Sequence, residues 1–486
     1  MSTAERTPQE RTGPAEGQRQ GGGTRPAPSE GRGVRQPARP AKGRWIADWD
    51  PDDRARWEAG GRSVARRNLA WSVLAEHVGF SVWVMFSIVV PYLAAAGYGF
   101  STAQLFWLVA LPNLVGSILR LPYTTAVARF GGRNWTVFSA LVLLLPTGML
   151  VWCLSSPDTP FGAFALTAAL AGLGGGNFAS SMANISYFYP ERLRGTALGV
   201  NAAGGNIGVS SVQLTGPFLI GLGVLGAGSL TDEGRVWLYN VPVFWGLLAL
   251  VAAAGAWWGM DNLSVAKARL SDQLPALKEK HTWVMALVYV GTFGSFIGYS
   301  FAFPLVARLE FPQFASLWLA ALGPLLGSLT RPAGGWLADK YAGAPITGTC
   351  FAVMGGSALL ALWSVSAGSF AAFFAAFMVL FCASGIANGS AYRSIPAIFT
   401  ASLTGRDPAT VKRLTAAALG WVSFAGALGG FAINQALSAS YDRTGSVAGA
   451  LLAFCAAYAV LGGVNWWHYQ RRVFTSAAPS LAEARV

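Results

Sequence analysis

Long uncharged stretches recur from about Leu69 to the C-terminus, and they constrain the fold of this chain more than any other feature. An apolar run of roughly 18 or more residues predicts a helix that spans a membrane, because it matches the thickness of the hydrocarbon core. The backbone in lipid must satisfy its own hydrogen bonds, which favours helices. Charges and Gly/Pro clusters delimit spans near residues 69–97, 101–128, 135–155, 160–189, 194–226, 236–260, 282–308, 312–338, 344–367, 369–400, 411–438 and 444–472. The sequence therefore predicts an all-α membrane protein of twelve transmembrane helices.

Polar segments between and around these spans divide the chain into parts. Residues 1–43 are rich in Gly, Pro, Arg, Gln and Glu, which predicts a disordered cytoplasmic tail rather than a cleavable signal. Residues 44–68 contain tryptophans and a basic cluster, and we interpret them as a segment on the cytoplasmic membrane surface. The other parts are a six-helix bundle over 69–260, a central cytoplasmic loop over 261–281, a second six-helix bundle over 282–472 and a cytoplasmic tail over 473–486.

The basic residues of the loops predict the orientation in the membrane. With the N-terminus inside, the outer loops carry only Arg235, Arg308 and Arg443. The inner loops carry Arg129, Arg133, Arg192, Arg194, Lys267, Arg269, Lys278, Lys280, Lys340, Arg406, Lys412 and Arg413. This excess follows the positive-inside rule and predicts a multi-pass protein of the cell membrane with both termini in the cytoplasm. It also accounts for the basic pI without nucleic acid, since no soluble basic module is visible.

Cysteine and histidine usage argues against a metal centre. Cys153, Cys350, Cys382 and Cys455 all lie in apolar spans without metal-like spacing, and the three histidines are far apart. The sequence shows no nucleophile–base pair or metal cluster, so we expect neither a cofactor nor an enzyme.

The two halves of the chain repeat each other at chosen positions. The run GSILR at 116–120 matches GSLTR at 327–331, which aligns Arg120 with Arg331. Along the first span, Glu76, Phe80, Trp83 and Ser87 match Tyr289, Phe293, Phe296 and Ser300 at steps that keep them on one helical face. In the fifth and eleventh spans, residues 198–199 and Gly208 match residues 419–420 and Gly429. Two pseudo-symmetric bundles of six helices resemble the plan of the major facilitator transporters, whose sites lie between the halves.

Arg120 and Arg331 both fall well inside their spans. A centred arginine costs about 2.5–3.5 kcal/mol on insertion scales and cannot lose its charge. Glu76 is the only acid deep within any span, so the positive charge exceeds the negative charge. A small anion held by the guanidinium groups is the simplest compensation. The alternative is that both arginines snorkel or bond backbone carbonyls.

Glycines and asparagines crowd the fourth, fifth and tenth spans. Small residues let membrane helices approach closely, so packing is the alternative to a functional role for each glycine. An asparagine in hydrocarbon needs a partner, either the anion or a neighbouring helix. We assign gating or signature roles to Gly175, Asn177, Gly205, Asn388 and Gly389. Asp339, at the end of the eighth span, resembles the charged loop motif of major facilitators, which latches the inward face.

Two longer motifs resemble the signatures of the nitrate/nitrite porter family. The first is GGGNFASSMANISYFYP over 174–190, which continues through Arg194 to Asn206. The second is GIANGSAYRSIP over 385–396, which contains Arg393. The run YVGTFGSF over 289–296 is also similar to this family. The resemblance covers all twelve predicted helices.

This resemblance implies a site for nitrate and nitrite. It implies that Arg120 and Arg331 clamp the anion from both halves, and that Asn206 and Tyr289 make polar contacts with it. It assigns the surroundings of the anion to Phe80, Phe178, Phe293, Gly420 and Ser423. The residues by themselves equally allow sulfate or a small carboxylate. A transporter of another anion on the same fold, or an anion sensor that moves nothing, are the alternatives.

Glu76 leaves the coupling mode open. We regard it as a candidate for coupling nitrate entry to protons, which would make the protein a nitrate:proton symporter. The alternative is that Glu76 pairs with Arg393 or a cytoplasmic base as part of a gate. Nitrate/nitrite antiport needs no proton. The expected partners are thus nitrate, nitrite, membrane lipids and possible protons, and the protein is expected to function as a monomer.

Overall fold

The computed structural model describes residues 44–226, 228–231, 234–266, 270–313, 317–473, 480–484 and 486. The predicted disordered tail over 1–43, two loop residues (Lys267 and Arg269) and part of the C-terminal tail therefore lie outside the described residues.

Helices account for almost all of the described chain. The first half contains α1 (Arg54–Arg56), η2 (Trp57–Gly61), α2 (Arg62–Val84), α3 (Phe86–Leu93), α4 (Thr102–Phe130), α5 (Gly132–Leu141), α6 (Leu144–Cys153), α7 (Phe161–Ala171), α8 (Leu173–Phe188), α9 (Glu191–Gly221) and α10 (Asn240–Gly259). The second half contains η3 (Leu270–Lys278), α11 (Lys280–Tyr289), η4 (Val290–Gly294), α12 (Ser295–Glu310), α13 (Leu317–Ala320), α14 (Leu322–Tyr341), α15 (Gly343–Ser366), α16 (Phe370–Ser402), α17 (Pro408–Thr444), α18 (Ala448–Tyr469) and η5 (Ala482–Ala484).

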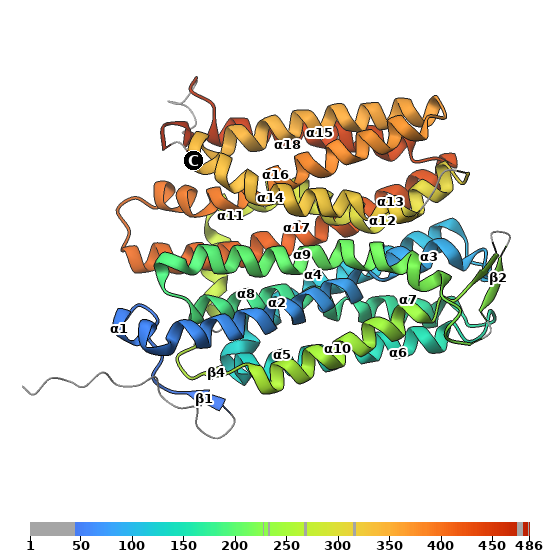
Figure 1. The fold of residues 1–486 in the computed structure, drawn as a ribbon. Helices are drawn as coiled ribbons and strands as arrows, with labels where there is room; N and C mark the ends of the chain where they lie inside the picture. The colour runs from blue at the N-terminus through green and yellow to red at the C-terminus, as the bar shows by residue number, and fades with distance from the viewer. Residues whose placement is uncertain are drawn as a thin grey trace, which may run out of the picture. The chain divides into compact units, whose positions relative to one another are not determined.

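Ten helical segments of the described chain are long and apolar enough to cross a membrane. Two more, α9 and α14, complete the twelve predicted spans but are less hydrophobic, because α9 carries asparagines and many glycines and α14 carries Arg331. Figure 1 shows the helices of the first half, blue to green, grouped beside those of the second half, yellow to red. The halves meet where α4 contacts α17, α3 contacts α12, and α9 contacts α14. The twelve-helix fold of two bundles agrees with the prediction.

Several boundaries differ from those expected. The helix of the first predicted span, α2, begins at Arg62 rather than near Leu69, because the charged turn before the apolar run remains helical. The third and fourth spans are each divided, with breaks after Leu141 and at Gly172. The seventh is interrupted by the π-helical turn η4, which separates α11 from α12. Wide turns of this kind are rare and often lie at functional sites.

Residues 44–68 pack on the ends of the helices at which Val486 also lies, which we call the terminal end. Strand β1 (Trp45–Ile46) pairs in parallel with β4 (Asn262–Leu263). The Trp49 indole donates to the carbonyl of Tyr187 at 3.0 Å, and Trp57 is only 4% exposed. This segment is thus tied to the protein, and its position on a membrane surface stays a prediction. A short hairpin of β2 (Ser229–Thr231) and β3 (Gly234–Val236) lies at the opposite, distal end.

Candidate functional site

Arg120 lies at the interface between the two halves. Its side chain comes from the middle of α4 and is 2% exposed. Its Nη1 donates to the Ser423 hydroxyl at 2.6 Å and to the Ser423 carbonyl at 3.3 Å, across the interface on α17. Among the described residues, its Nε and Nη2 have no hydrogen-bond partner. One edge of the guanidinium is therefore held by the protein, and the other edge remains available to an acceptor.

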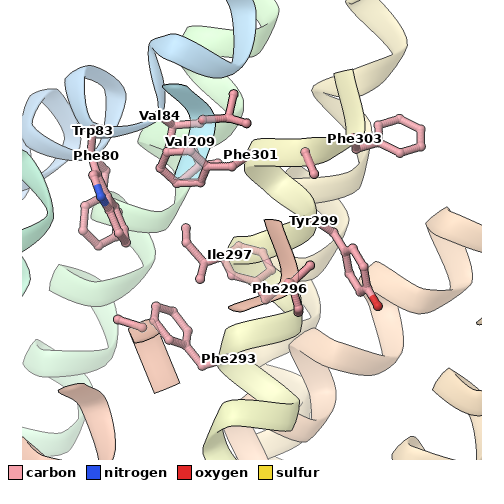
Figure 2. Packing of buried hydrophobic residues seen from close by; sticks show 14 of the residues in the cluster. Phe80, Trp83, Val84, Val209, Phe293, Phe296, Ile297, Tyr299, Phe301 and Phe303 are labelled. Carbon is pink, nitrogen blue, oxygen red and sulfur yellow. The ribbon is translucent and has the colours of Figure 1, made fainter. Parts of the chain in front are cut away.

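Three aromatic rings surround this guanidinium. Its carbon lies 4.9 Å from the centroid of Phe178, 5.0 Å from Phe293 and 5.7 Å from Trp83. Phe80 and Phe178 are stacked, with centroids 6.1 Å apart. Figure 2 shows Phe80 and Trp83 together on the first half, facing the aromatic residues of η4 and α12 on the second half. Such ring faces attract cations and exclude water, which strengthens the field of Arg120.

Arg331 takes the equivalent position on α14. Its Nη2 donates to the Tyr289 hydroxyl at 3.4 Å, and its guanidinium carbon lies 5.9 Å from the Tyr392 ring. Its buried Nη1 has no partner within the described chain. Tyr289 stacks in turn on Phe293 with centroids 5.6 Å apart, and Phe293 also contacts Arg120. The two arginines therefore share one aromatic wall.

A cavity of about 540 Å³ leads from Arg120 toward the terminal end. Its lining comes from α4, α8, α9, η3, α16 and α17, and includes Arg120, Thr124, Phe178, Met182, Arg194, Leu198, Tyr392, Arg413, Gly420 and Ser423. Arg413 is exposed to solvent, so the cavity opens at this end. Gly420 and Ser423, which the resemblance assigns to the surroundings of the anion, both line this cavity.

The distal side of the same interface is closed. The Gln213 amide of α9 donates to the Ser300 carbonyl of α12 at 2.6 Å and to the Ser87 hydroxyl at 3.1 Å. Trp83 also meets Phe301 edge-on, with centroids 5.4 Å apart. A cavity thus opens at the terminal end, while described residues of the two halves contact each other at the distal end.

The asparagines and glycines that crowd α8, α9 and α16 differ in their surroundings. Asn206 and Asn177 are buried, and neither amide has a partner among the described side chains and backbone. The glycines pack closely. A Cβ on Gly175 would lie 2.7 Å from the Trp83 ring, and one on Gly389 would meet the backbone of α14 at Arg331. Asn388, next to Gly389 on α16, is buried, with its amide oxygen unpartnered in the part of the chain described.

Two charged residues of the predicted set lie away from the cavity. Asp339 accepts a hydrogen bond from Arg393 at 2.7 Å, and both side chains are more than half exposed. The alternative that pairs Arg393 with Glu76 is therefore wrong. A second exposed ion pair, Lys412 with Glu191 at 2.8 Å, joins the halves at the terminal end.

Glu76 is 1% exposed within the first half. It accepts hydrogen bonds from the Ser181 hydroxyl and, at 2.6 Å, from the Asn201 amide. Sequence reasoning selected Glu76 but missed Ser181 and Asn201, as well as Trp83, Tyr392 and Gln213. Ser181 and Tyr392 lie inside the two signature motifs, and Trp83 lies inside the internal repeat, so a signal for these three was present.

Comparison with known proteins identifies relatives over most of the chain. A family model described as the Major Facilitator Superfamily matches residues 73–434. The chain is 42% identical over 445 residues to the nitrate/nitrite transporter NarU of Salmonella typhimurium, covering 88% of this chain and 96% of that protein. It is 34% identical over 450 residues to the probable nitrate/nitrite antiporter NarK2 of Thermus thermophilus, covering 89% of this chain and 98% of that protein.

Solved structures share the fold at low identity. A D-xylose–proton symporter superposes with a TM-score of 0.63 at 14% identity, covering 83% of this chain and 97% of that chain. A bacterial homologue of the human lysosomal transporter Spinster, in an inward-facing and occupied conformation, gives a TM-score of 0.62 at 17% identity. The match covers 88% of this chain and 99% of that chain. At such identities the likeness concerns the fold alone.

Proposed function

Because this chain belongs to the nitrate/nitrite porters of the major facilitator superfamily, we propose that it carries nitrate and nitrite across the cell membrane by alternating access. The observation that carries the proposal is the pair of arginines at the interface. Each has a buried nitrogen without a partner in the described structure, and each is held by a residue on another helix. A planar anion fits such donors, because a guanidinium presents its N–H groups in one plane.

The aromatic wall supports a flat, weakly hydrated cargo. Phe178 and Phe293 flank Arg120, and Tyr289 extends the same wall to Arg331. Nitrate and nitrite are planar, so their faces pack on rings while their oxygens accept from guanidinium and amide groups. Asn206 is proposed to supply such an amide, since both of its amide atoms are buried and unpartnered among the described residues.

The direction of opening supports an inward-facing state. We place the terminal end in the cytoplasm, because its loops carry most of the basic residues. The cavity that opens there, rimmed by Arg194 and Arg413, would admit or release the anion on the cytoplasmic side. The carrier is proposed to act as a monomer, since both arginines come from one chain.

Gln213→Ala is expected to favour opening at the distal end. The Gln213 amide bridges the halves through Ser300, and a hydrogen bond of this kind contributes about 0.5–1.5 kcal/mol. Its loss should raise the outward-open population roughly 2- to 12-fold. Spin labels at the exposed Ser155 and Ser366, in a cysteine-free background, would report a longer distance across the distal end.

Asn434→Ala is the matched control for this substitution. The register that aligns Gly208 with Gly429 aligns Gln213 with Asn434, but the Asn434 amide donates within the second half, to Gly298 and Gly430. Its removal should leave the distal distance unchanged. Equal shifts in both variants would show that the bridge across the halves is not what holds this end closed.

Purified protein in liposomes tests the proposed function. Vesicles loaded with unlabelled nitrite should accumulate labelled nitrate by exchange, and excess external sulfate should not compete. Binding of nitrate without exchange would indicate a sensor. Exchange that sulfate or small carboxylates inhibit as well as nitrate does would indicate a transporter of another anion.

A further inference from the structure

Trp83 on α2 is fully buried, and the family resemblance gives it no part in the anion site. The guanidinium carbon of Arg120 lies over its ring, 5.7 Å from the centroid. The indole Nε1 of Trp83 donates a hydrogen bond at 2.8 Å to the carbonyl of Pro112, which lies on α4 together with Arg120. The ring is therefore fastened to the helix whose arginine it faces.

Two glycines leave the space that this indole occupies. A Cβ on Gly116 of α4 would lie 2.7 Å from the indole nitrogen, and a Cβ on Gly175 of α8 would lie 2.7 Å from the ring. Gly116 precedes Arg120 by four residues, which is about one turn of the helix. The ring is thus wedged between α4 and α8, and dense packing of this kind does not let a large side chain leave its place.

The contacts of Arg120 come from both halves of the protein. Ser423 and Phe293 belong to the second half, whereas Phe178 and Trp83 belong to the first. Alternating access moves one half against the other around the site. Contacts across the interface therefore change during transport, while contacts within one half persist. Because Trp83 is also bonded to α4 itself, it keeps its place beside the guanidinium when the halves move.

The second half holds its arginine in a different way. The repeat matches Trp83 with Phe296, and a Cβ on Gly327 would lie 2.7 Å from the Phe296 ring. A phenyl ring has no N–H group to donate. Arg331 instead donates to the hydroxyl of Tyr289, which belongs to its own half, at 3.4 Å. A ring in the first half thus takes the place that a hydroxyl has in the second.

We propose that Trp83 is a positioning residue, which keeps the guanidinium of Arg120 directed at the anion site while the contacts to Ser423 and Phe293 are broken and remade. The inference rests on the proposed function. The face of the indole attracts the positive charge, and its N–H group fixes the ring to α4. An arginine that is held in advance loses less conformational freedom when the anion binds, so the anion binds more tightly.

Trp83→Phe is expected to raise the dissociation constant of nitrate roughly 2- to 30-fold, the range that corresponds to cation–π contacts. Phenylalanine keeps a ring, but the ring is smaller and loses its bond to Pro112. Calorimetry on the purified protein measures the dissociation constant. In proteoliposomes the KM for nitrate exchange should rise as well, while the maximal rate stays near that of the wild type. Trp245→Phe is the matched control, because Trp245 is buried in the same half but packs on His77 and Phe244. It should bind nitrate as the wild type does.

The Arg120→Lys background distinguishes positioning from a structural role. If Trp83 acts through the guanidinium, Trp83→Phe should raise the KM of the residual exchange much less in this background than in the wild type. A tryptophan that only fills space would weaken the first half whichever residue stands at position 120. Equal fold-changes in the two backgrounds would therefore overturn the inference.

The remaining outcomes separate the two proposals. Failure of the wild type to bind or exchange nitrate would overturn the proposed function. Normal wild-type binding, with an unchanged dissociation constant in folded Trp83→Phe, would overturn the positioning role alone. So would a lower maximal rate without a change in binding, since it would assign Trp83 to its edge contact with Phe301.

Gly116→Ala provides a second test if Trp83→Phe does not fold. The added carbon presses on the indole nitrogen and displaces the ring without removing it. A higher dissociation constant for nitrate supports the inference, and an unchanged constant in the folded variant opposes it.

Discussion

Arg120→Lys and Arg331→Lys are each expected to reduce nitrate transport roughly 10- to 100-fold, which corresponds to the loss of about 1.5–3 kcal/mol from a charge-assisted hydrogen bond. Lysine keeps the positive charge but not the planar group. Arg120 uses Nη1 to hold Ser423 and leaves Nε and Nη2 for an acceptor, and a single ammonium cannot satisfy both sides with this geometry. Lysine also loses the flat face that packs against Phe178 and Phe293.

Uptake of labelled nitrate into proteoliposomes, corrected for the amount of reconstituted protein, measures this effect. Arg129→Lys is the control, because Arg129 lies on the same helix as Arg120 but at its exposed terminal end. It should transport at the wild-type rate. Near-normal transport by both Lys variants at 120 and 331 would remove the arginines from the anion site.

Gly389→Ala and Gly205→Ala are expected to reduce turnover about 10-fold or more, since overpacking of a tight contact costs about 1–3 kcal/mol. A Cβ on Gly389 would lie 3.0 Å from the backbone of α14, at the Arg331 carbonyl carbon and the Gly335 nitrogen. Backbone cannot move aside as a side chain does, so α16 must separate from α14 and displace Arg331. At Gly205 the added carbon meets the Glu76 carboxyl. Transport should fall more than the yield of folded protein.

The chain supplies its own controls for these two changes. A Cβ on Gly335 of α14, or on Gly199 of α9, would meet nothing within 4 Å. Gly335→Ala and Gly199→Ala should therefore transport normally. Folded yield comes from size-exclusion chromatography, and turnover from nitrate/nitrite exchange. Equal loss in all four variants would indicate general sensitivity of these helices rather than a specific close contact.

Much of this architecture was predictable because the bilayer makes simple demands on a chain. Apolar length identified the spans, and the repeat identified Arg120 and Arg331, since two centred charges at matching positions need an explanation. The break at Gly172 was not predictable, because glycine is tolerated in membrane helices and nothing local distinguishes a bend from a straight packing contact.

The hydrogen-bond partners of Glu76 could not be predicted from the sequence. Its partners Ser181 and Asn201 lie on α8 and α9, far from it along the chain. Which face each helix presents depends on its rotation, which periodicity cannot determine in helices that are apolar nearly all round. The same limit applied to Arg393. It pairs with Asp339, and only the packing of α16 on α14 brings these two residues together.

The charges gathered at the interface also determine how the carrier responds to voltage. The two arginines supply two positive charges, and a monovalent anion bound between them offsets one of these. A membrane potential acts on moving charge with about 2.3 kcal/mol per elementary charge per 100 mV. Because the loaded and unloaded forms differ by one charge, the potential biases the two reorientation steps differently, whereas exchange of one monovalent anion for another moves no net charge across the membrane.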